Sequence, residues 1–112
     1  MKNKPWHNVP AEAVEGMPGV SIRWVVGEDD GAENFAMRVF DVEPRATIPS
    51  HHHWYEQEMF ILSGEGVAEA GGEEERVGPG SVLWVEPDEP HAFRNTGDDV
   101  LRFVCCVPLR ND

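Results

Sequence analysis

The sequence predicts an all-β protein, either a β-sandwich or a β-barrel, a class that includes the jelly roll. Short runs rich in β-branched and aromatic residues recur at roughly 8–12-residue spacing, and glycine or proline separates them. No stretch shows a helical periodicity, an internal repeat or a linker. The chain of 112 residues has the length of a single domain, 1–112, which is enough to bury a hydrophobic core.

The predicted strands begin at residue 20, after a segment that prolines interrupt. Residues 1–19 contain Pro5, Pro10 and Pro18, so we expect a short extended N-terminal arm there. Gly71 and Gly72 lie between two of the later strands and predict a hairpin turn. We place the strands at residues 20–26, 35–42, 58–62, 67–70, 75–77, 82–85, 91–94 and 100–107, with residues 46–54 extended as well.

The composition is acidic, with 21 Asp and Glu residues against nine Lys and Arg and a formal net charge of −12. Phosphate binding needs clustered basic residues, so we expect no nucleic-acid partner. No apolar run approaches the roughly 18 residues of a membrane span, and no apolar segment follows the basic N-terminus as in a secretory signal. Cys105 and Cys106 are adjacent and suit a reducing compartment, so we expect a cytoplasmic protein without a membrane partner.

Alternation along three predicted strands indicates which side chains face the interior. Each of these strands carries an arginine, at position 38, 94 or 102, which is expected to face solvent. Arg38 and Arg94 are the cationic candidates for substrate contact, but their parity favours ion pairs at the surface or at an interface. The neighbours expected to point inward are Met37, Val39, His91, Phe93, Phe103, Cys105 and Val107. Trp24 and Trp84 have outward parity beside apolar residues, which indicates a second buried face.

Four of the five histidines lie in two short blocks, and three of them are consecutive. On an extended strand the rings of His51 and His53 share one face, with Cα atoms about 6.5–7 Å apart. Either Gln57 or Glu58 can supply a third ligand after a short turn, and His91 can supply a fourth. Imidazole suits Zn, Cu, Fe and Ni, and Mn when oxygen ligands join. The sequence therefore predicts a transition-metal site in an otherwise apolar interior.

The side chains expected near this site are mainly apolar. Trp54 and Tyr55 are placed at the cavity mouth, with ordinary packing as the alternative. Cys105 is expected near the metal as a buried thiol or as a redox-sensitive residue. The predicted cavity and substrate-contacting residues are Met37, Trp54, Met59, Ile61, Phe93, Phe103 and Cys105.

These motifs resemble those of the small single-domain cupins. The first cupin motif corresponds to His51 through Glu58 followed by Gly64 and Gly66, and the second to Gly80 through Pro87 followed by His91 and Asn95. More narrowly, the chain is similar to the manganese-containing small cupins of hyperthermophilic bacteria. The resemblance covers about residues 35–108. It implies a jelly-roll β-barrel, a homodimer and one divalent transition metal, with Mn or Fe favoured and Cu, Ni or Zn as alternatives.

The sequence departs from the narrower group at the third ligand position. That group has a histidine there, in the pattern H-x-H-x3-H, whereas this chain has Gln57 at the same spacing. Gln57 also shares parity with Met59 and Ile61, which favours it, and Glu58 is the alternative because one more residue of spacing is tolerated in cupins. Three histidines with glutamine leave two net positive charges on a divalent metal, and with glutamate one. The glutamine site should attract an anionic small molecule more strongly.

For function, the resemblance implies a metal-dependent enzyme that acts on a small oxygenated or unsaturated organic substrate. Dioxygenase-like oxidative C–C cleavage is the favoured reaction, and lyase, isomerase and decarboxylase chemistry are also known among cupins. The alternative is a non-catalytic module that binds or senses a small ligand through the same metal site. No serine-nucleophile motif or phosphate-binding glycine loop competes with these interpretations.

Overall fold

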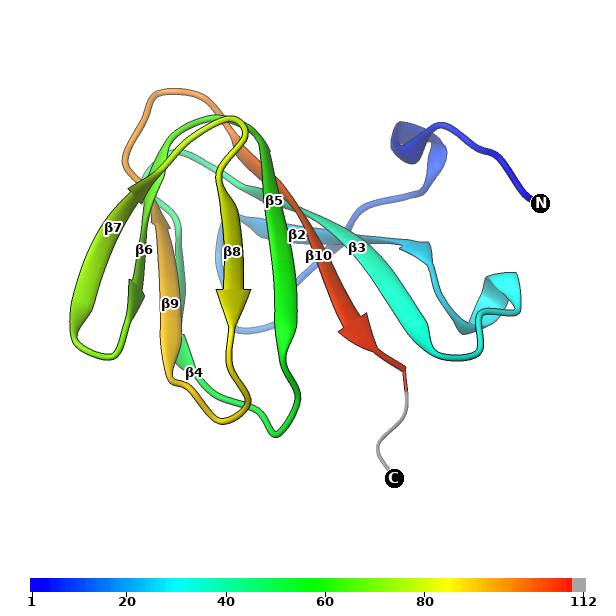
Figure 1. Ribbon diagram of the computed structural model, residues 1–112. Coiled ribbons are helices and arrows are strands. Elements are labelled where there is room, and N and C mark those ends of the chain that lie inside the picture. Colours follow the sequence, from blue (N-terminus) through cyan, green and yellow to red (C-terminus); the bar gives the residue numbers. More distant parts are fainter. Residues whose placement is uncertain (110–112) are drawn as a thin grey trace.

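The computed structural model describes residues 1–109 and consists of two antiparallel β-sheets, which confirms the all-β prediction. The six-stranded sheet has the order β1-β2-β3-β10-β5-β8, and the four-stranded sheet has the order β4-β9-β6-β7 (Figure 1). The strands are β1 (Glu12–Ala13), β2 (Val20–Val26), β3 (Phe35–Val42), β4 (Thr47–His51), β5 (Gln57–Ser63), β6 (Gly66–Ala70), β7 (Glu73–Val77), β8 (Val82–Val85), β9 (His91–Asn95) and β10 (Leu101–Pro108).

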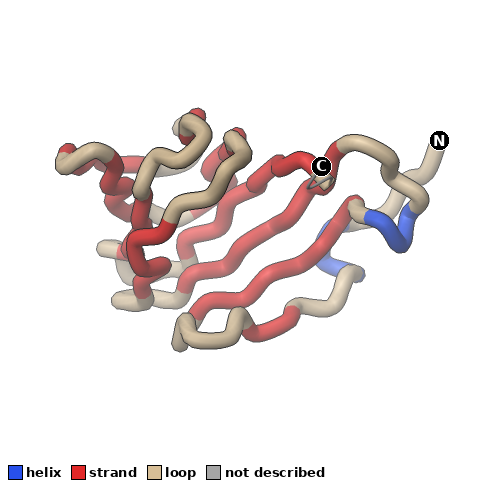
Figure 2. Tube along the Cα trace, turned by 90° about the horizontal axis from the view of Figure 1, so that it is seen from below, coloured by secondary structure: helices blue, strands red, loops and turns tan. Residues whose placement is uncertain are grey.

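Helical structure is limited to two single turns in the described residues. They are the 3-10 helices η1 (Trp6–Asn8) and η2 (Glu28–Asp30), and both lie at one end of the molecule beside the six-stranded sheet (Figure 2). None of the helices described is long and apolar enough to cross a membrane. The expected arm is extended except for η1, and it adds a strand that was not predicted, because β1 pairs with β2.

Apolar side chains from the inner faces of both sheets form one core. Phe103 and Ile61 are among the largest side chains that are fully buried, and they lie on adjacent strands of the six-stranded sheet. Burial alternates strictly along β5, β9 and β10, as expected of strands with one face toward a core. The inward orientation predicted for Phe93, Phe103 and Cys105 is therefore confirmed.

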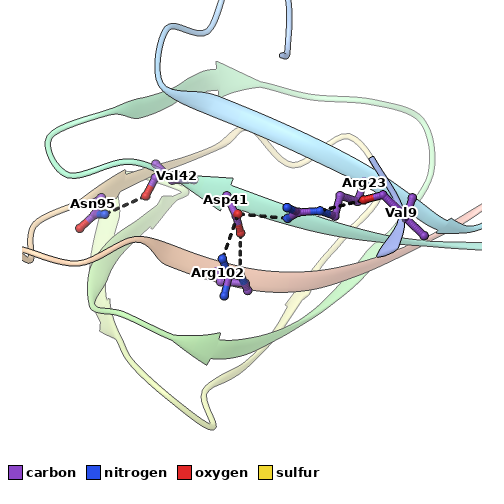
Figure 3. Close-up of polar contacts among 6 residues, drawn as sticks. All are labelled: Val9, Arg23, Asp41, Val42, Asn95 and Arg102. Carbon is purple, nitrogen blue, oxygen red and sulfur yellow. Dashed lines mark hydrogen bonds and ion pairs between the residues drawn. The ribbon is translucent and has the colours of Figure 1, made fainter. Parts of the chain in front are cut away.

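A buried asparagine joins the two sheets beneath this core. The side-chain amide of Asn95, at the end of β9, donates a hydrogen bond of 2.8 Å to the carbonyl oxygen of Val42 (Figure 3). It donates a second, also of 2.8 Å, to the carbonyl oxygen of Asp99. Its Oδ1 accepts a hydrogen bond of 2.9 Å from the backbone N–H of Gly97. Every polar atom of this side chain is thus satisfied, as burial requires.

The outer face of the six-stranded sheet carries an ionic cluster. Asp41 of β3 accepts hydrogen bonds from Arg102 of β10 at 2.7 and 3.1 Å and from Arg23 of β2 at 3.1 Å (Figure 3). Both guanidinium groups also lie over the indole ring of Trp6. The guanidinium carbon of Arg23 is 5.0 Å from the ring centroid and that of Arg102 is 4.5 Å from it. These contacts fix the N-terminal arm on the sheet, because Arg23 also donates to the carbonyl of Val9.

The structure corrects the predicted orientation of β3 and of Trp24. Arg38 and Trp24 line the interior cavity, contrary to their predicted outward parity. Met37 is 40% exposed, and Val39, although buried as expected, lies on the same face as Asp41. The prediction placed the arginine in solvent because a charged group seldom leaves water. Instead, its guanidinium lies in a cavity that opens to solvent, near the rings of Trp24 and Phe40. The aromatic faces attract the positive charge and partly replace its hydration.

Candidate metal centre

Three histidines converge at one end of the barrel. His51 ends β4 and is the register partner of His91, the first residue of β9, while His53 follows in the loop. One ring nitrogen of each lies within 4.8 Å of those of the other two. Pro49 causes this geometry locally, because it has no N–H for the ladder, and the register of β4 with β9 shifts between Ile48 and His51.

Backbone carbonyl groups hold all three imidazole rings in the same tautomer. Nδ1 of His51 donates to the carbonyl oxygen of Pro49, at 2.9 Å. Nδ1 of His53 donates to that of Tyr55, and Nδ1 of His91 donates to that of Glu89, each at 2.8 Å. A carbonyl oxygen only accepts, so each neutral ring carries its proton on Nδ1 and has a free lone pair on Nε2. A hydrogen bond from the other ring nitrogen to a carbonyl oxygen is typical of histidine ligands of metals.

Gln57 brings an oxygen atom to the same point. It is the first residue of β5, is 5% exposed, and places Oε1 3.0 Å from Nε2 of His53. Its amide nitrogen donates to the sulfur of Met59 at 3.3 Å, which directs the oxygen toward the histidines. The two atoms that face each other, Oε1 and Nε2, are both acceptors, and a cation between them removes their repulsion.

His91 has the most enclosed ring of the group. It is 1% exposed, and its Nε2 has no hydrogen-bond partner within the described chain. Burial lowers the pKa of His91, and the neighbouring His51 and His53 lower it further, although the Glu89 carbonyl opposes the shift. The ring is therefore held neutral with an unsatisfied lone pair, which is the state that a metal ion requires. The donor set fits one divalent transition metal.

The structure does not bring the alternative third ligand to this point. Glu58 is exposed on the opposite face of β5 and lines a different cavity with Trp54 and Cys106. His52 is exposed as well, as the alternation of an extended segment predicts. The four candidate ligands, His51, His53, Gln57 and His91, are all neutral, so a divalent ion that they held would keep both positive charges.

The cluster opens into a cavity of about 360 Å³ between the sheets. Its wall is mainly apolar and aromatic, and the N-terminal arm contributes two of its residues. The lining residues are Val14, Met17, Ile22, Trp24, Arg38, Phe40, Ile48, His51, His53, Tyr55, Gln57, Phe93, Phe103 and Cys105. A mostly apolar cavity with a few converging polar groups is the usual form of a small-molecule site.

The predicted cavity residues separate into three groups in the structure. Phe93, Phe103 and Cys105 line the cavity. Met59 and Ile61 belong to the core beneath it. The remaining two, Met37 and Trp54, do not reach it: each is exposed and lines a different depression of the surface.

Several cavity residues escaped the sequence analysis. Arg38 and Trp24 were assigned to the outer face from the alternation of side chains along their strands. Val14 and Met17 lie in the N-terminal arm, and no local sequence pattern indicates that the arm packs against the cavity. Burial raises the pKa of the Cys105 thiol, which opposes its reactivity although Arg38 donates to its sulfur at 3.0 Å. The ring of Tyr55 stacks on His53 at a centroid distance of 4.0 Å and stiffens this ligand.

Comparison with known proteins identifies the family. The model of the cupin domain, Cupin_2, matches residues 38–107, which include all four candidate ligands. The chain belongs to the cupin family. The two cupin motifs found in the sequence thus lie in one domain. In the structure, His51 and His53 of the first motif lie next to His91 of the second.

Among solved cupin structures, the polyketide cyclase RemF of Streptomyces resistomycificus is similar over nearly the whole chain. The TM-score is 0.92 at 31% identity, covering 98% of this chain and 80% of RemF. A predicted oxalate decarboxylase of Thermotoga maritima superposes with a TM-score of 0.82 at 22% identity, covering 95% and 97% of the two chains, and shows the shared fold.

In sequence, the oxalate-binding protein of Thermotoga maritima is 33% identical over 67 residues, which are 59% of this cupin and 55% of that protein. The alignments span about half the length of the curated relatives that the chain matches.

Proposed function

We propose that this cupin is a metal-dependent enzyme that acts on a small, oxygenated and unsaturated organic substrate. The carrying observation is the group of three imidazole Nε2 atoms and one amide oxygen, held by backbone carbonyls and by Met59 at the end of an apolar cavity. His51, His53, Gln57 and His91 would hold one divalent ion. Such an ion supplies Lewis acidity to a bound carbonyl or carboxylate oxygen, and redox chemistry if it is Mn or Fe.

The chain's own residues would bind and enclose the substrate. Aromatic side chains, among them Phe40, Phe93 and Phe103, give the cavity flat apolar surfaces that suit an unsaturated carbon skeleton. The same surfaces exclude water from the reacting atoms, which strengthens the electrostatic interactions inside the cavity. The phenol of Tyr55 lines this cavity beside His53 and is the candidate donor of a proton or hydrogen bond to substrate.

Two reaction types use these features differently. The similarity to a polyketide cyclase supports carbonyl chemistry that consumes no oxidant. The motif resemblance supports oxidative C–C cleavage, which consumes dioxygen. We favour the first, because the likeness to the cyclase covers 98% of the chain. Substrate conversion under strict anaerobiosis tests it: turnover that stops without dioxygen assigns the oxidative reaction instead.

The second candidate function is a non-catalytic module that binds a small anion at the same centre. It is supported by the similarity to a protein named for oxalate binding. Both candidates need the metal, and they separate by turnover. A ligand that binds tightly and is recovered unchanged, with any of the favoured metals loaded, would assign the protein to the binding class.

The first experiment is metal analysis of protein purified without added metal or affinity tag. We expect about one equivalent of a divalent transition metal in the parent, and its loss in the His53→Ala and Gln57→Ala variants. His52→Ala is the matched control, since that exposed neighbour should leave the metal in place. If the Gln57→Ala variant still binds the metal, Gln57 is not a ligand. If the parent protein binds no metal, the proposed function is refuted.

A further inference from the structure

Arg38 is a cation in the cavity without an anionic partner. Its Nη2 donates to the sulfur of Cys105 at 3.0 Å, and its Nε is buried with no hydrogen-bond partner. The guanidinium carbon lies 5.3 Å from the ring centre of Trp24 and 5.0 Å from that of Phe40. No carboxylate oxygen of the described chain lies within 4.0 Å of this guanidinium, although the chain is strongly acidic.

The arrangement around Arg38 leaves its charge uncompensated. The thiol of Cys105 is a weak acceptor, and burial raises its pKa and so keeps it neutral. The aromatic faces attract the cation but give its N–H groups no oxygen acceptor. A buried donor without an acceptor is costly, so the site is complete only when a ligand supplies one. A planar fork of N–H groups suits a carboxylate in particular.

The surroundings direct such a ligand into the cavity with the histidines. No Asp or Glu is among the residues lining that cavity in the described chain, so an anion inside it meets only neutral groups and the arginine. Glu28, Asp29 and Asp30 line an adjoining depression that also includes Arg38, but no ion pair joins them to Arg38 in the described chain, and Asp30 pairs with Lys4 instead. The positive charge in the cavity is thus available to a bound molecule.

The sheet register fixes the separation between the arginine and the ligand cluster. Arg38 pairs with Cys105, and Cys105 pairs with Met59, so two strand spacings, or about 10 Å, separate the Cα atoms of Arg38 and Met59. Gln57 lies two residues further along the same face of β5. A ligand that contacts both Arg38 and the histidine and glutamine cluster therefore lies across β10, along the wall that Phe103 and Cys105 line.

We infer that the substrate is a planar unsaturated carboxylic acid that binds with its carboxylate on Arg38. An oxygen at its opposite end would lie at the histidine and glutamine cluster, and its carbon skeleton would pack on the aromatic wall. This inference rests on the proposed function for that opposite end only. The contact with Arg38 requires no metal, so the two claims can fail separately.

The test uses two probes of one shape. The first, 4-(hydroxycarbamoyl)benzoate, has a metal-chelating hydroxamate opposite a carboxylate, and the second, 4-(hydroxycarbamoyl)benzamide, replaces the carboxylate by a neutral amide. Calorimetric titration of the full chain loaded with Zn²⁺ should show the carboxylate binding about tenfold more tightly, the usual effect of a charge-assisted pair. Arg38→Gln should abolish this preference, Arg38→Lys should retain part of it, and the surface variant Arg94→Gln should keep it in full.

The outcomes distinguish the two claims, provided that each variant unfolds at a temperature near that of the parent. No preference in the parent, or an undiminished preference in both Arg38 variants, would overturn the assignment of the arginine. Removal of Zn²⁺ should weaken both probes equally and leave their ratio unchanged. Probes that bind equally well with and without metal would instead refute the metal-dependent function, whatever their ratio.

Discussion

Oε1 of Gln57 faces Nε2 of His53 at 3.0 Å, although the hydrogen bond from His53 to the carbonyl of Tyr55 assigns the ring proton to the other nitrogen. Two lone pairs therefore point at each other within a partly buried cluster. His91 adds a third, with no partner in the described chain. The described chain arranges acceptors around one point, and no acidic residue lines the cavity onto which they open, although Glu89 lies near His91. The residual charge of a divalent ion held there would be the main property of this centre.

This charge predicts the behaviour of the Gln57→Glu variant. A carboxylate ligand would remove one of the two positive charges, so anions should bind more weakly. Two unit charges about 4 Å apart interact by about 1 kcal/mol in bulk water and by about 4 kcal/mol near a protein surface. We expect oxalate to bind the Zn²⁺-loaded variant at least about tenfold more weakly than the parent, measured by calorimetric titration.

The matched control changes the neighbouring residue, which faces the other way. Glu58→Gln alters the charge by the same amount on the opposite face of β5 and should leave oxalate affinity within about twofold, because this carboxylate lies outside the cavity of the histidines. Equal oxalate affinity in the parent and in Gln57→Glu would show that the residual charge of the centre does not govern anion binding.

The buried amide of Asn95 should be important for stability. Replacement by alanine would leave the carbonyl groups of Val42 and Asp99 without donors and remove the acceptor of Gly97. An unsatisfied buried group costs about 1–3 kcal/mol, but only the contact with Val42 is fully buried, and water can replace part of the other two. We therefore expect the free energy of unfolding to fall by about 2–4 kcal/mol. Urea denaturation measures the change. Asn3→Ala, at an exposed position in the arm, should change it by less than about 0.5 kcal/mol.

Much of the strand pattern could be predicted because it is local. Glycine and proline delimit the strands, and residues 20–26, 35–42 and 82–85 form strands at the predicted boundaries. The pairing of His51 with His53 follows from the two-residue period of an extended chain, and Gln57 follows from the parity of β5. These features depend only on neighbouring residues, so one sequence is sufficient to find them.

The remainder of the site depends on contacts between distant segments. The alternation of side chains along β3 defines two faces but does not say which one points inward. The prediction chose the wrong face, because Arg38 lies in the cavity rather than in solvent. No local signal shows that Trp24 and Phe40 would provide faces for its guanidinium. Likewise, Val14 and Met17 reach the cavity only because the arm pairs with β2. The cavity is therefore a tertiary property, whereas the ligand cluster is largely a pattern in the sequence.

Stability in acid should depend on Asp41. Burial by itself raises the pKa of Asp41, but hydrogen bonds and charge from Arg102 and Arg23 outweigh it and hold the pKa below its ordinary value of 3.8. Because the folded-state pKa is the lower one, its contribution is fully present above about pH 4 and is lost as the pH falls through the folded-state pKa. Asp41→Asn should cost about 2 kcal/mol at pH 7.

The diagnostic result is the pH dependence of this difference in stability. Between pH 7 and pH 5 the parent and Asp41→Asn should differ by a constant amount, and the difference should shrink as the pH falls below about 4. Thermal unfolding at several pH values measures it. Glu73→Gln, on the exposed strand β7, controls for the loss of one negative charge. A difference that stays constant into strong acid would mean that the ionic cluster does not stabilise the fold.

The outer face of β5 and β8 should form the contact of a homodimer. Phe60 and Val82 are register partners there, exposed by 47% and 74%, with Trp84 at 57% beside them. Apolar side chains gathered in this way are typical of an interaction surface. We expect the parent to sediment as a dimer and Val82→Glu to sediment as a folded monomer, because a charge buried in an apolar contact is strongly unfavourable. Val26→Glu, exposed on β2 away from this face, should remain dimeric. A monomeric parent at micromolar concentration, or a dimeric Val82→Glu, would exclude this face as the subunit contact.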